Sequence, residues 1–363
     1  MDTCGGTQVK EEHALYSIDA LIKHGLVSAD LRHPLSKVAD RYAIAVTTSM
    51  ADLIDPNNPN DPIGLQFLPQ EAELVTVQGE DPDPIGDVAH SPVEGIIHRY
   101  KDRVLLKLLH ICPVYCRFCF RRETVGPQGA GTLGPDAIGA ALNYIRDHDE
   151  IWEVILTGGD PLALSPRRLK DVMSALSQID HVRIVRFHTR VPAVDPSRIN
   201  EALVEALKAS GKTIYIALHA NHPRELTPAA RIAIARLVDA GFAMVSQTVL
   251  LRGINDDIET LTMLMRSFVE NRIKPYYLHH GDLAPGTSHF RVDIERGQNL
   301  VRALLGRVSG LCQPSYVLDI PGGHGKSPIG PAYLERNATQ DYEVTDFNGR
   351  AHGYRDITLR EPT

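Results

Sequence analysis

Short apolar runs recur through the middle of this 363-residue chain at intervals that suit alternating strands and helices. After the first interval they start roughly 30 residues apart, the length of a βα unit. Each run is rich in β-branched or aliphatic residues, as strands are. The six runs are VLLKLL (104–109), IWEVILT (151–157), HVRIVRFH (181–188), KTIYIALH (212–219), FAMVSQTVLL (242–251) and KPYYLHH (274–280).

Helix signals fill the gaps between these runs. A capping residue beside a proline at the first helical position is a common start. The predicted starts are Pro135-Asp136, Ser165-Pro166, Asp195-Pro196-Ser197 and Thr227-Pro228. Six consecutive βα units with right-handed crossovers predict an α/β fold whose parallel sheet curls into a barrel, left open because six units fall short of eight. A flat doubly wound sheet is the alternative.

The flanks of this repeat look different. Residues 1–95 are predicted to form a helical or irregular N-terminal extension, because closely spaced prolines from residue 56 to residue 92 prevent a continuous sheet or long helices. Residues 96–330 are predicted to form the barrel core, and residues 331–363 a short tail. One large domain with appended flanks suits this length better than two equal halves.

Charge and hydropathy exclude several classes of protein. The 38 basic and 45 acidic side chains give a net charge of −7, which argues against nucleic-acid binding through clustered Lys and Arg. No apolar run approaches the roughly 18–20 residues of a membrane span. The first residues lack the basic start and apolar centre of a signal peptide. We therefore expect a cytoplasmic protein with neither a membrane nor a nucleic acid as its partner.

Every predicted strand ends in a polar or ionisable group. The carboxyl ends of barrel strands meet at one mouth, where function concentrates. We therefore expect these side chains to line an active-site mouth. In chain order they are His110 and Cys112; Thr157, Gly158, Gly159 and Asp160; His188 and Arg190; His219, Asn221 and His222; Gln247; His279, His280 and Asp282; and Asp319, which ends a seventh run, SYVLD.

Three cysteines, Cys112, Cys116 and Cys119, fall within eight residues. Structural zinc normally takes four ligands, and Cys312 or His110 could complete such a set, but the spacing is not that of a zinc knuckle. Burial by chance is improbable for three cysteines at this density. A [4Fe–4S] cluster held by three thiolates would leave one iron open to bind a small molecule.

The glycine-rich segment PGGHGKS (321–327) is not a phosphate-binding loop, because Ile320 stands where the first required glycine would be. The glycines before Lys326 give its backbone freedom. A lysine that holds pyridoxal phosphate as a Schiff base must swing away when a substrate amine replaces it. The alternative is a solvated loop lysine.

The sequence CPVYCRFC resembles the cysteine motif of the radical S-adenosylmethionine enzymes, which use a partial barrel of six βα units. From about residue 100 to 330 the chain resembles one family among them, the lysine 2,3-aminomutases. His324 departs from that pattern, since the family usually has glycine there. The matching stretches are DRVLLKLLHICPVYCRFCFRR, ILTGGDPL, LHANHPREL, SQTVLLRGIND, YYLHHGDLAPGTSHFR and SGLCQPSYVLDIPGGHGKSPIG.

This resemblance implies a role for each candidate residue. Cys112, Cys116 and Cys119 would ligate the [4Fe–4S] cluster, and Lys326 would carry pyridoxal 5′-phosphate. Arg121 would bind the α-carboxylate of the substrate. Arg103 and Gln247 would contact pyridoxal phosphate, and Asp282 and Asp319 would face the far end of the substrate. The residues implied to bind S-adenosylmethionine are Thr157, Gly158, Gly159 and Asp160. Further residues implied to bind a cofactor are Arg190, His219 and Asn221.

The resemblance further implies an isomerase that moves the α-amino group of L-lysine to the β-carbon through a 5′-deoxyadenosyl radical. Two carboxylates that converge need a cation between them, which favours a basic amino acid over glutamate. Arginine is a possible substrate for the same reason. A relative that supplies β-lysine for elongation factor P also fits, because this tail has no cysteines. A zinc-binding protein without catalysis is the remote alternative. An external one-electron reductant such as flavodoxin or ferredoxin and a homo-oligomer are the expected partners.

Overall fold

The computed structural model describes residues 14–126, 131–336 and 341–356. Cys4 lies outside these ranges. The described residues contain one large sheet, and all six predicted strands and the seventh run belong to it. Its strands are β3 (Ile96–Tyr100), β4 (Arg103–Leu109), β5 (Glu153–Gly158), β6 (Ile184–Thr189), β7 (Thr213–His219), β8 (Ala243–Val249), β9 (Lys274–His279), β10 (Ser315–Ile320) and β11 (Gly325–Pro328).

The strands of this sheet are hydrogen-bonded in chain order, and neighbours from β4 to β10 are parallel. A doubly wound sheet would reverse its strand order part-way, so that alternative is wrong. β3 and β11 are antiparallel to their neighbours and form the two edges. The backbone N–H of Lys326 in β11 donates to the Tyr100 hydroxyl of β3 at 2.7 Å, which brings the edges together. The fold is the expected partial barrel.

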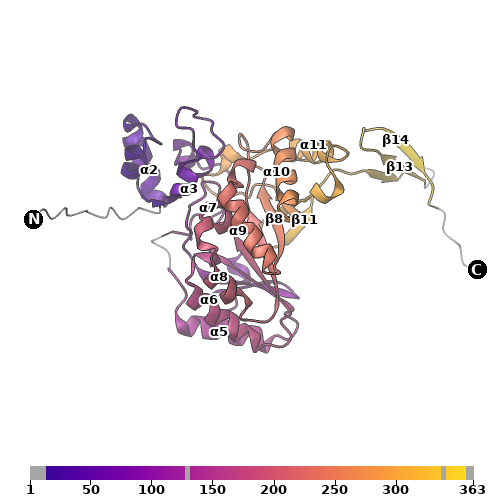
Figure 1. Cartoon of the computed structure of the whole chain (residues 1–363). Helices are drawn as coiled ribbons and strands as arrows, with labels where there is room; N and C mark the ends of the chain where they lie inside the picture. Colours follow the sequence, from indigo (N-terminus) through magenta and orange to yellow (C-terminus); the bar gives the residue numbers. More distant parts are fainter. Residues whose placement is uncertain (1–13, 127–130, 337–340, 357–363) are drawn as a thin grey trace, which may run out of the picture.

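Helices connect consecutive strands and follow one another beside the sheet in Figure 1. Two of the predicted starts are confirmed: the side chains of Ser165 and Thr227 cap α6 and α9. The helices are α5 (Pro135–Asp147), α6 (Pro166–Ser177), α7 (Val191–Val194), α8 (Glu201–Lys208), α9 (Pro228–Asp239), α10 (Ile258–Glu270) and α11 (Ile294–Leu304).

A third predicted start is confirmed, because α5 begins at Pro135, although Gly134 before it offers no side chain as a cap. The fourth predicted start is wrong. Asp195-Pro196 opens only a short 3-10 turn, Pro196–Arg198. The helix itself, α8, starts at Glu201, because the Asn200 side chain accepts a hydrogen bond from the Leu203 N–H at 3.0 Å.

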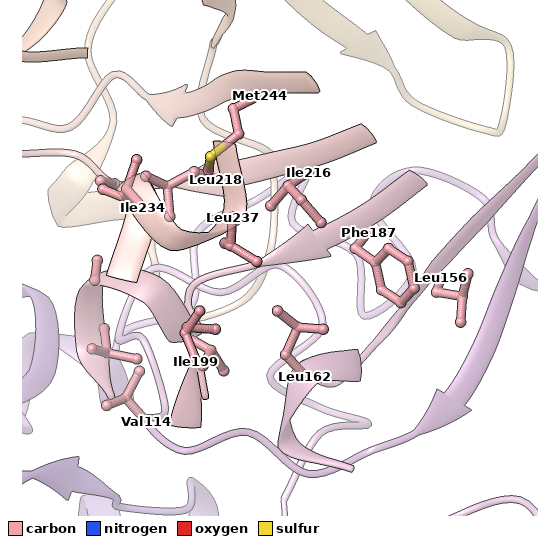
Figure 2. Packing of buried hydrophobic residues seen from close by; sticks show 14 of the residues in the cluster. Val114, Leu156, Leu162, Phe187, Ile199, Ile216, Leu218, Ile234, Leu237 and Met244 are labelled. Atoms are coloured by element: carbon pink, nitrogen blue, oxygen red, sulfur yellow. The ribbon is translucent and has the colours of Figure 1, made fainter. Parts of the chain in front are cut away.

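The N-terminal residues are helical and irregular, as expected, and they join the core of the barrel. Leu21, Val38 and Phe67 are fully buried in the same hydrophobic cluster as the barrel strands. Figure 2 shows another part of this cluster, where residues of β5, β6, β7 and β8 lie beside residues of α9. The division at residue 95 stays a prediction. The N-terminal elements are β1 (Ala14–Leu15), α1 (Ile18–Lys23), α2 (Arg32–Arg41), β2 (Val46–Thr47), α3 (Thr48–Ala51), α4 (Gly64–Phe67) and the 3-10 turns Ala29–Leu31, Glu71–Leu74 and Val88–His90.

After the barrel, three short strands form a separate antiparallel sheet that projects from the body at the upper right of Figure 1. They are β12 (Leu334–Arg336), β13 (Tyr342–Thr345) and β14 (Ala351–Tyr354), and most of their residues are exposed. Within the described residues, no helix has the length and apolar character needed to cross a membrane.

Candidate active site

The inner face of the barrel carries a set of polar side chains. Successive residues of a strand point to opposite faces, so alternate residues point into the barrel and the residues between them point toward the helices. The Gln247 amide of β8 donates to Nε2 of His188 in β6 at 3.2 Å. The His188 and His219 rings lie 5.6 Å apart between centroids. The strand ends that the sequence predicted to converge therefore do so at these positions.

The histidines of this face are neutral. Burial is the main cause that lowers the pKa of His188, and it lowers the pKa of His219 to about 3. Burial likewise lowers the pKa of His279. Nε2 of His219 and Nε2 of His279 are buried and find no hydrogen-bond partner in the described part of the chain. These two atoms are free to bind a polar ligand within the barrel.

Two histidines of the predicted mouth have structural contacts instead. The His222 side chain accepts from the Arg224 N–H at 3.2 Å and so caps a 3-10 turn. His280 Nδ1 lies 2.8 Å from the Tyr316 hydroxyl, within hydrogen-bond distance. The structure therefore does not bring every strand-end histidine into the barrel.

The cysteine loop follows β4 and rests on the N-terminal residues. The Tyr115 N–H donates to the Ala45 carbonyl at 3.0 Å, and the Arg117 N–H donates to the Gln66 carbonyl at 2.8 Å. Between them these bonds fix the backbone on either side of Cys116. No motif in the sequence indicated that the N-terminal region would support this loop.

A buried carboxylate also anchors the cysteine loop. Glu73 is fully buried and accepts from Nε and Nη2 of Arg117, the latter at 2.5 Å. It also accepts from Nη2 of Arg122. Two cations on one carboxylate compensate the cost of burying it. The residues between the second and third cysteines are thereby anchored.

The thiols of the cysteine loop are protonated in the free protein. Burial, with repulsion from neighbouring thiolates and Asp160, raises the pKa of Cys112 well above its usual value. Burial also raises the pKa of Cys119 to about 11. Without metal these thiols therefore stay protonated, and iron would displace their protons. In the described residues no three acidic, histidine or cysteine side chains gather around one metal-ion position. Ligands of a cluster bind different irons and need not gather in this way.

Arg190 contacts one of these thiols directly. Its Nη1 donates to Sγ of Cys116 at 3.0 Å, and its Nη2 donates to Gln66 Oε1 and to Glu225 Oε2, each at 2.6 Å. The Asn221 amide donates to the same Gln66 oxygen at 3.0 Å. Arg190 and Asn221 were predicted from the sequence to lie at the mouth. Gln66 and Glu225, which orient these two side chains, were not predicted from the sequence.

The segment after β5 passes very close to the end of β4. A Cβ on Gly158 would meet the Leu109 carbonyl oxygen, and one on Gly159 would meet the Ile111 carbonyl oxygen. Only glycine fits at these two positions, and Gly158 has the positive φ of +110° that glycine tolerates. Thr157, at the end of β5, is buried.

Asp160 is committed to protein donors. It accepts from the Thr189 hydroxyl at 2.7 Å, from the Arg190 N–H at 2.6 Å and from the Leu162 N–H at 3.0 Å. These bonds join β5 to β6 at the mouth. The contact of this segment with S-adenosylmethionine stays a prediction.

Lys326 and Asp319 face each other across the β10–β11 hairpin. The Lys326 Nζ donates to Asp319 Oδ1 at 2.6 Å. His279 Nδ1 lies 3.6 Å from the other oxygen of Asp319. Despite burial, which alone would raise it, these two neighbours lower the pKa of Asp319. Lys326 is therefore not a solvated loop lysine.

Asp282 lies near this pair, and within the described ranges no salt bridge joins it to a cation. Burial, followed by repulsion from Asp319, raises the pKa of Asp282 to about 7, although Lys326 and Arg121 act in the opposite direction. The acidic pair predicted from the sequence is therefore electrostatically coupled. One member is ionised and paired with Lys326, and the other is partly protonated near neutral pH.

A family model described as the radical SAM superfamily matches residues 106–264. The L-lysine 2,3-aminomutase of Clostridium subterminale is 36% identical over 333 residues, which cover 92% of this chain and 80% of that protein. A putative L-lysine 2,3-aminomutase of Aquifex aeolicus is 39% identical, over 88% of this chain and 86% of that protein. The chain belongs to the lysine 2,3-aminomutase family of radical SAM enzymes. It is therefore an enzyme, an isomerase, which excludes the zinc-binding protein without catalysis.

Similarity to this family does not by itself define the substrate. The glutamate 2,3-aminomutase of Clostridioides difficile is 34% identical over 333 residues, which cover 92% of this chain and 78% of that protein. The family uses a [4Fe–4S] cluster, S-adenosylmethionine and pyridoxal 5′-phosphate. The class of reaction is thus that of a radical SAM aminomutase acting on an amino acid.

Within this aminomutase, Arg103 lies at the start of β4 and its guanidinium stacks on the Tyr100 ring at 3.8 Å from the centroid. The Tyr100 hydroxyl in turn accepts from the Lys326 N–H. Tyr100 thus contacts both Arg103 and Lys326, the lysine predicted to hold pyridoxal phosphate. Tyr100, which links the two, carried no signal in the sequence.

Proposed function

We propose that this chain is a lysine 2,3-aminomutase that depends on S-adenosylmethionine and pyridoxal phosphate and converts L-lysine to β-lysine. The observation that carries this proposal is the acidic pair beside Lys326. In the free protein the Lys326 ammonium is the cation that Asp319 pairs with. When Lys326 instead holds pyridoxal phosphate, its charge is no longer available and Asp319 needs another cation.

The terminal ammonium of lysine provides that cation. Asp319 and Asp282 together would bind it, and its charge would favour the ionised form of Asp282. A glutamate side chain would add a third negative charge at this position. The electrostatics of the pair therefore support a basic amino acid.

The other end of the substrate has a matching group. Arg121 follows the cysteine loop and is largely buried. A guanidinium binds a carboxylate through two parallel hydrogen bonds, so Arg121 is suited to the α-carboxylate. With Arg121 at one end and the acidic pair at the other, the Cα–Cβ bond is held in a fixed place.

The residues that would hold the cofactors fit them. Cys112, Cys116 and Cys119 provide three thiol ligands, and Lys326 is an amine inside the barrel, close to Arg103. When bound, the cofactors would supply a carbon-centred radical and a carbonyl group that holds the nitrogen while it moves from Cα to Cβ of the substrate. Burial keeps His188 and His219 neutral, so neither imidazole brings a positive charge to the inner face of the barrel.

Anaerobic assay with lysine, arginine and glutamate, followed by chiral analysis of the products, tests the proposal. We expect β-lysine from lysine and no product from glutamate. The variant Asp319→Asn should lose turnover of lysine while its binding of S-adenosylmethionine is retained. Turnover of glutamate would contradict the proposal. An Asp319→Asn variant that lost lysine turnover and S-adenosylmethionine binding to the same extent would also contradict it.

Arginine is the second candidate substrate, because two adjacent carboxylates also suit a guanidinium. Its larger planar head must fit between Asp282 and Asp319. The same assay separates the two substrates by their relative kcat/KM.

A further inference from the structure

One N-terminal segment, residues 80–91, packs directly against the candidate active site. We call it the strap. The Arg291 guanidinium pairs with buried Glu80 at its start. Near its end, His90 Nε2 lies 3.0 Å from the carbonyl oxygen of Gly323, in the turn that precedes Lys326. The strap thus contacts both the chain that follows Asp282 and the turn before Lys326.

A second buried acidic group of the strap is Asp87. Its Oδ2 accepts from Arg121 twice, from Nε at 3.1 Å and from Nη2 at 2.9 Å. Its Oδ1 accepts from Nη2 of Arg99 at 3.1 Å. Burial alone would raise the pKa of Asp87, but Arg121, Lys107 and Arg99 lower it. Asp87 is therefore an ionised group fixed against the guanidinium that we assign to the substrate.

The backbone of the strap holds this carboxylate in place. Asp83 Oδ1 accepts from the Asp87 N–H at 2.7 Å, and Asp83 Oδ2 accepts from the Val88 N–H at 2.8 Å. These two bonds form a tight turn, and Gly86 has the positive φ of +66° that such a turn requires. Asp87 cannot move away from Arg121 without breaking this turn.

Asp87 occupies only one of the two edges of the Arg121 guanidinium. A guanidinium has one edge formed by Nε and one terminal nitrogen, and a second edge formed by its two terminal nitrogens. Asp87 takes the first edge with a single oxygen. We propose that Asp87 is a positioning residue that holds Arg121 by this edge and thereby directs the other edge at the α-carboxylate of the substrate.

This inference rests on the proposed function, and the test separates the two. Protein reconstituted with pyridoxal phosphate, without S-adenosylmethionine or reductant, is titrated with lysine and with cadaverine, which is lysine without its carboxylate. The change in absorbance when an amine displaces Lys326 gives the half-saturating concentration. Comparison of the two ligands in one sample removes the effect of any unfolded fraction.

In Asp87→Asn we expect the half-saturating lysine concentration to rise about tenfold, because Arg121 loses a charge-assisted partner. The value for cadaverine should stay the same. Asp81→Asn is the matched control, since Asp81 is an exposed carboxylate of the strap, and it should change neither value. Thermal unfolding of both variants checks their stability.

Three results would overturn the inference: a lower half-saturating lysine concentration, which would make Asp87 a competitor of the substrate; an equal rise for both ligands; or no change. If the wild-type protein shows no response to lysine, the proposed function itself is wrong and the inference with it. If the wild-type protein responds and Asp87→Asn behaves like it, only the inference is wrong.

Discussion

Lys326 and Asp319 occupy directly opposed positions of the β10–β11 hairpin, with Nζ and Oδ1 2.6 Å apart. The hairpin thus places the predicted pyridoxal lysine and a predicted substrate-binding carboxylate on the same face of the sheet. In the free protein each neutralises the other. The use of Lys326 to hold a cofactor would release Asp319 for a substrate cation.

Replacement of Lys326 by alanine should abolish covalent attachment of pyridoxal phosphate. The nitrogen that forms the bond is lost with the side chain. Absorbance of the reconstituted protein before and after borohydride reduction measures the attachment. Lys170→Ala, an exposed lysine of α6, is the control and should bind the cofactor normally. Retained attachment in Lys326→Ala would refute the assignment.

The pKa of about 7 for Asp282 predicts a pH dependence for lysine binding. Burial and Asp319 favour the neutral form, whereas a substrate ammonium requires the ionised form. The half-saturating lysine concentration, measured from the absorbance change of protein reconstituted with pyridoxal phosphate, should therefore fall about tenfold from pH 6 to pH 8, as Asp282 loses its proton. In Asp319→Asn the repulsion disappears, so the midpoint of this change should move to lower pH. An unchanged midpoint would show that Asp282 is not the titrating group.

Gly86→Ala should disturb the turn that precedes Lys326. A Cβ at Gly86 would lie 2.5 Å from the Gly323 backbone nitrogen. Gly79 also has a positive φ, but a Cβ there would meet no atom of the described residues within 4 Å, so Gly79→Ala measures backbone strain alone. We expect Gly86→Ala to lose about 1–2 kcal/mol more stability than Gly79→Ala, because it adds the clash to the strain. Thermal unfolding measures this difference, and equal losses would show that the two segments do not touch.

Arg190→Gln should shift the midpoint potential of the cluster. The Arg190 guanidinium donates to Sγ of Cys116, and a positive charge there favours the reduced, more negative cluster. Its loss should lower the potential by tens of millivolts, since about 59 mV corresponds to a tenfold change for one electron. Redox titration followed by electron paramagnetic resonance measures the shift. Arg168→Gln, an exposed arginine of α6, should leave the potential unchanged, and a higher potential in Arg190→Gln would contradict the account.

The barrel could be predicted because its signals are local and periodic. Each strand is a short apolar run, and the chain-order sheet follows from the repeat of βα units. The helix start at Ser165 was right because its hydroxyl caps the first turn. The start at Asp195 was wrong because proline alone marks no helix, and Asn200 is the residue whose side chain caps one.

The site could be predicted only where its residues share a short motif or a strand end. Cys116 and Lys326 belong to such motifs. Gln66, Glu73 and Asp87 come from the N-terminal region, and each contacts a partner more than 30 positions away. No sequence spacing reveals these contacts, because they depend on how the N-terminal region packs against the barrel.

The movement of nitrogen within lysine is the most direct test of the central claim. The reconstituted, reduced protein is incubated with S-adenosylmethionine and lysine that carries ¹⁵N at the α-amino group and ¹³C at the β-carbon. We predict that nuclear magnetic resonance will show a new one-bond coupling between the two labels, as nitrogen arrives at the β-carbon. Active, cluster-loaded protein that leaves ¹⁵N on Cα of lysine while it acts on another amino acid would contradict the account.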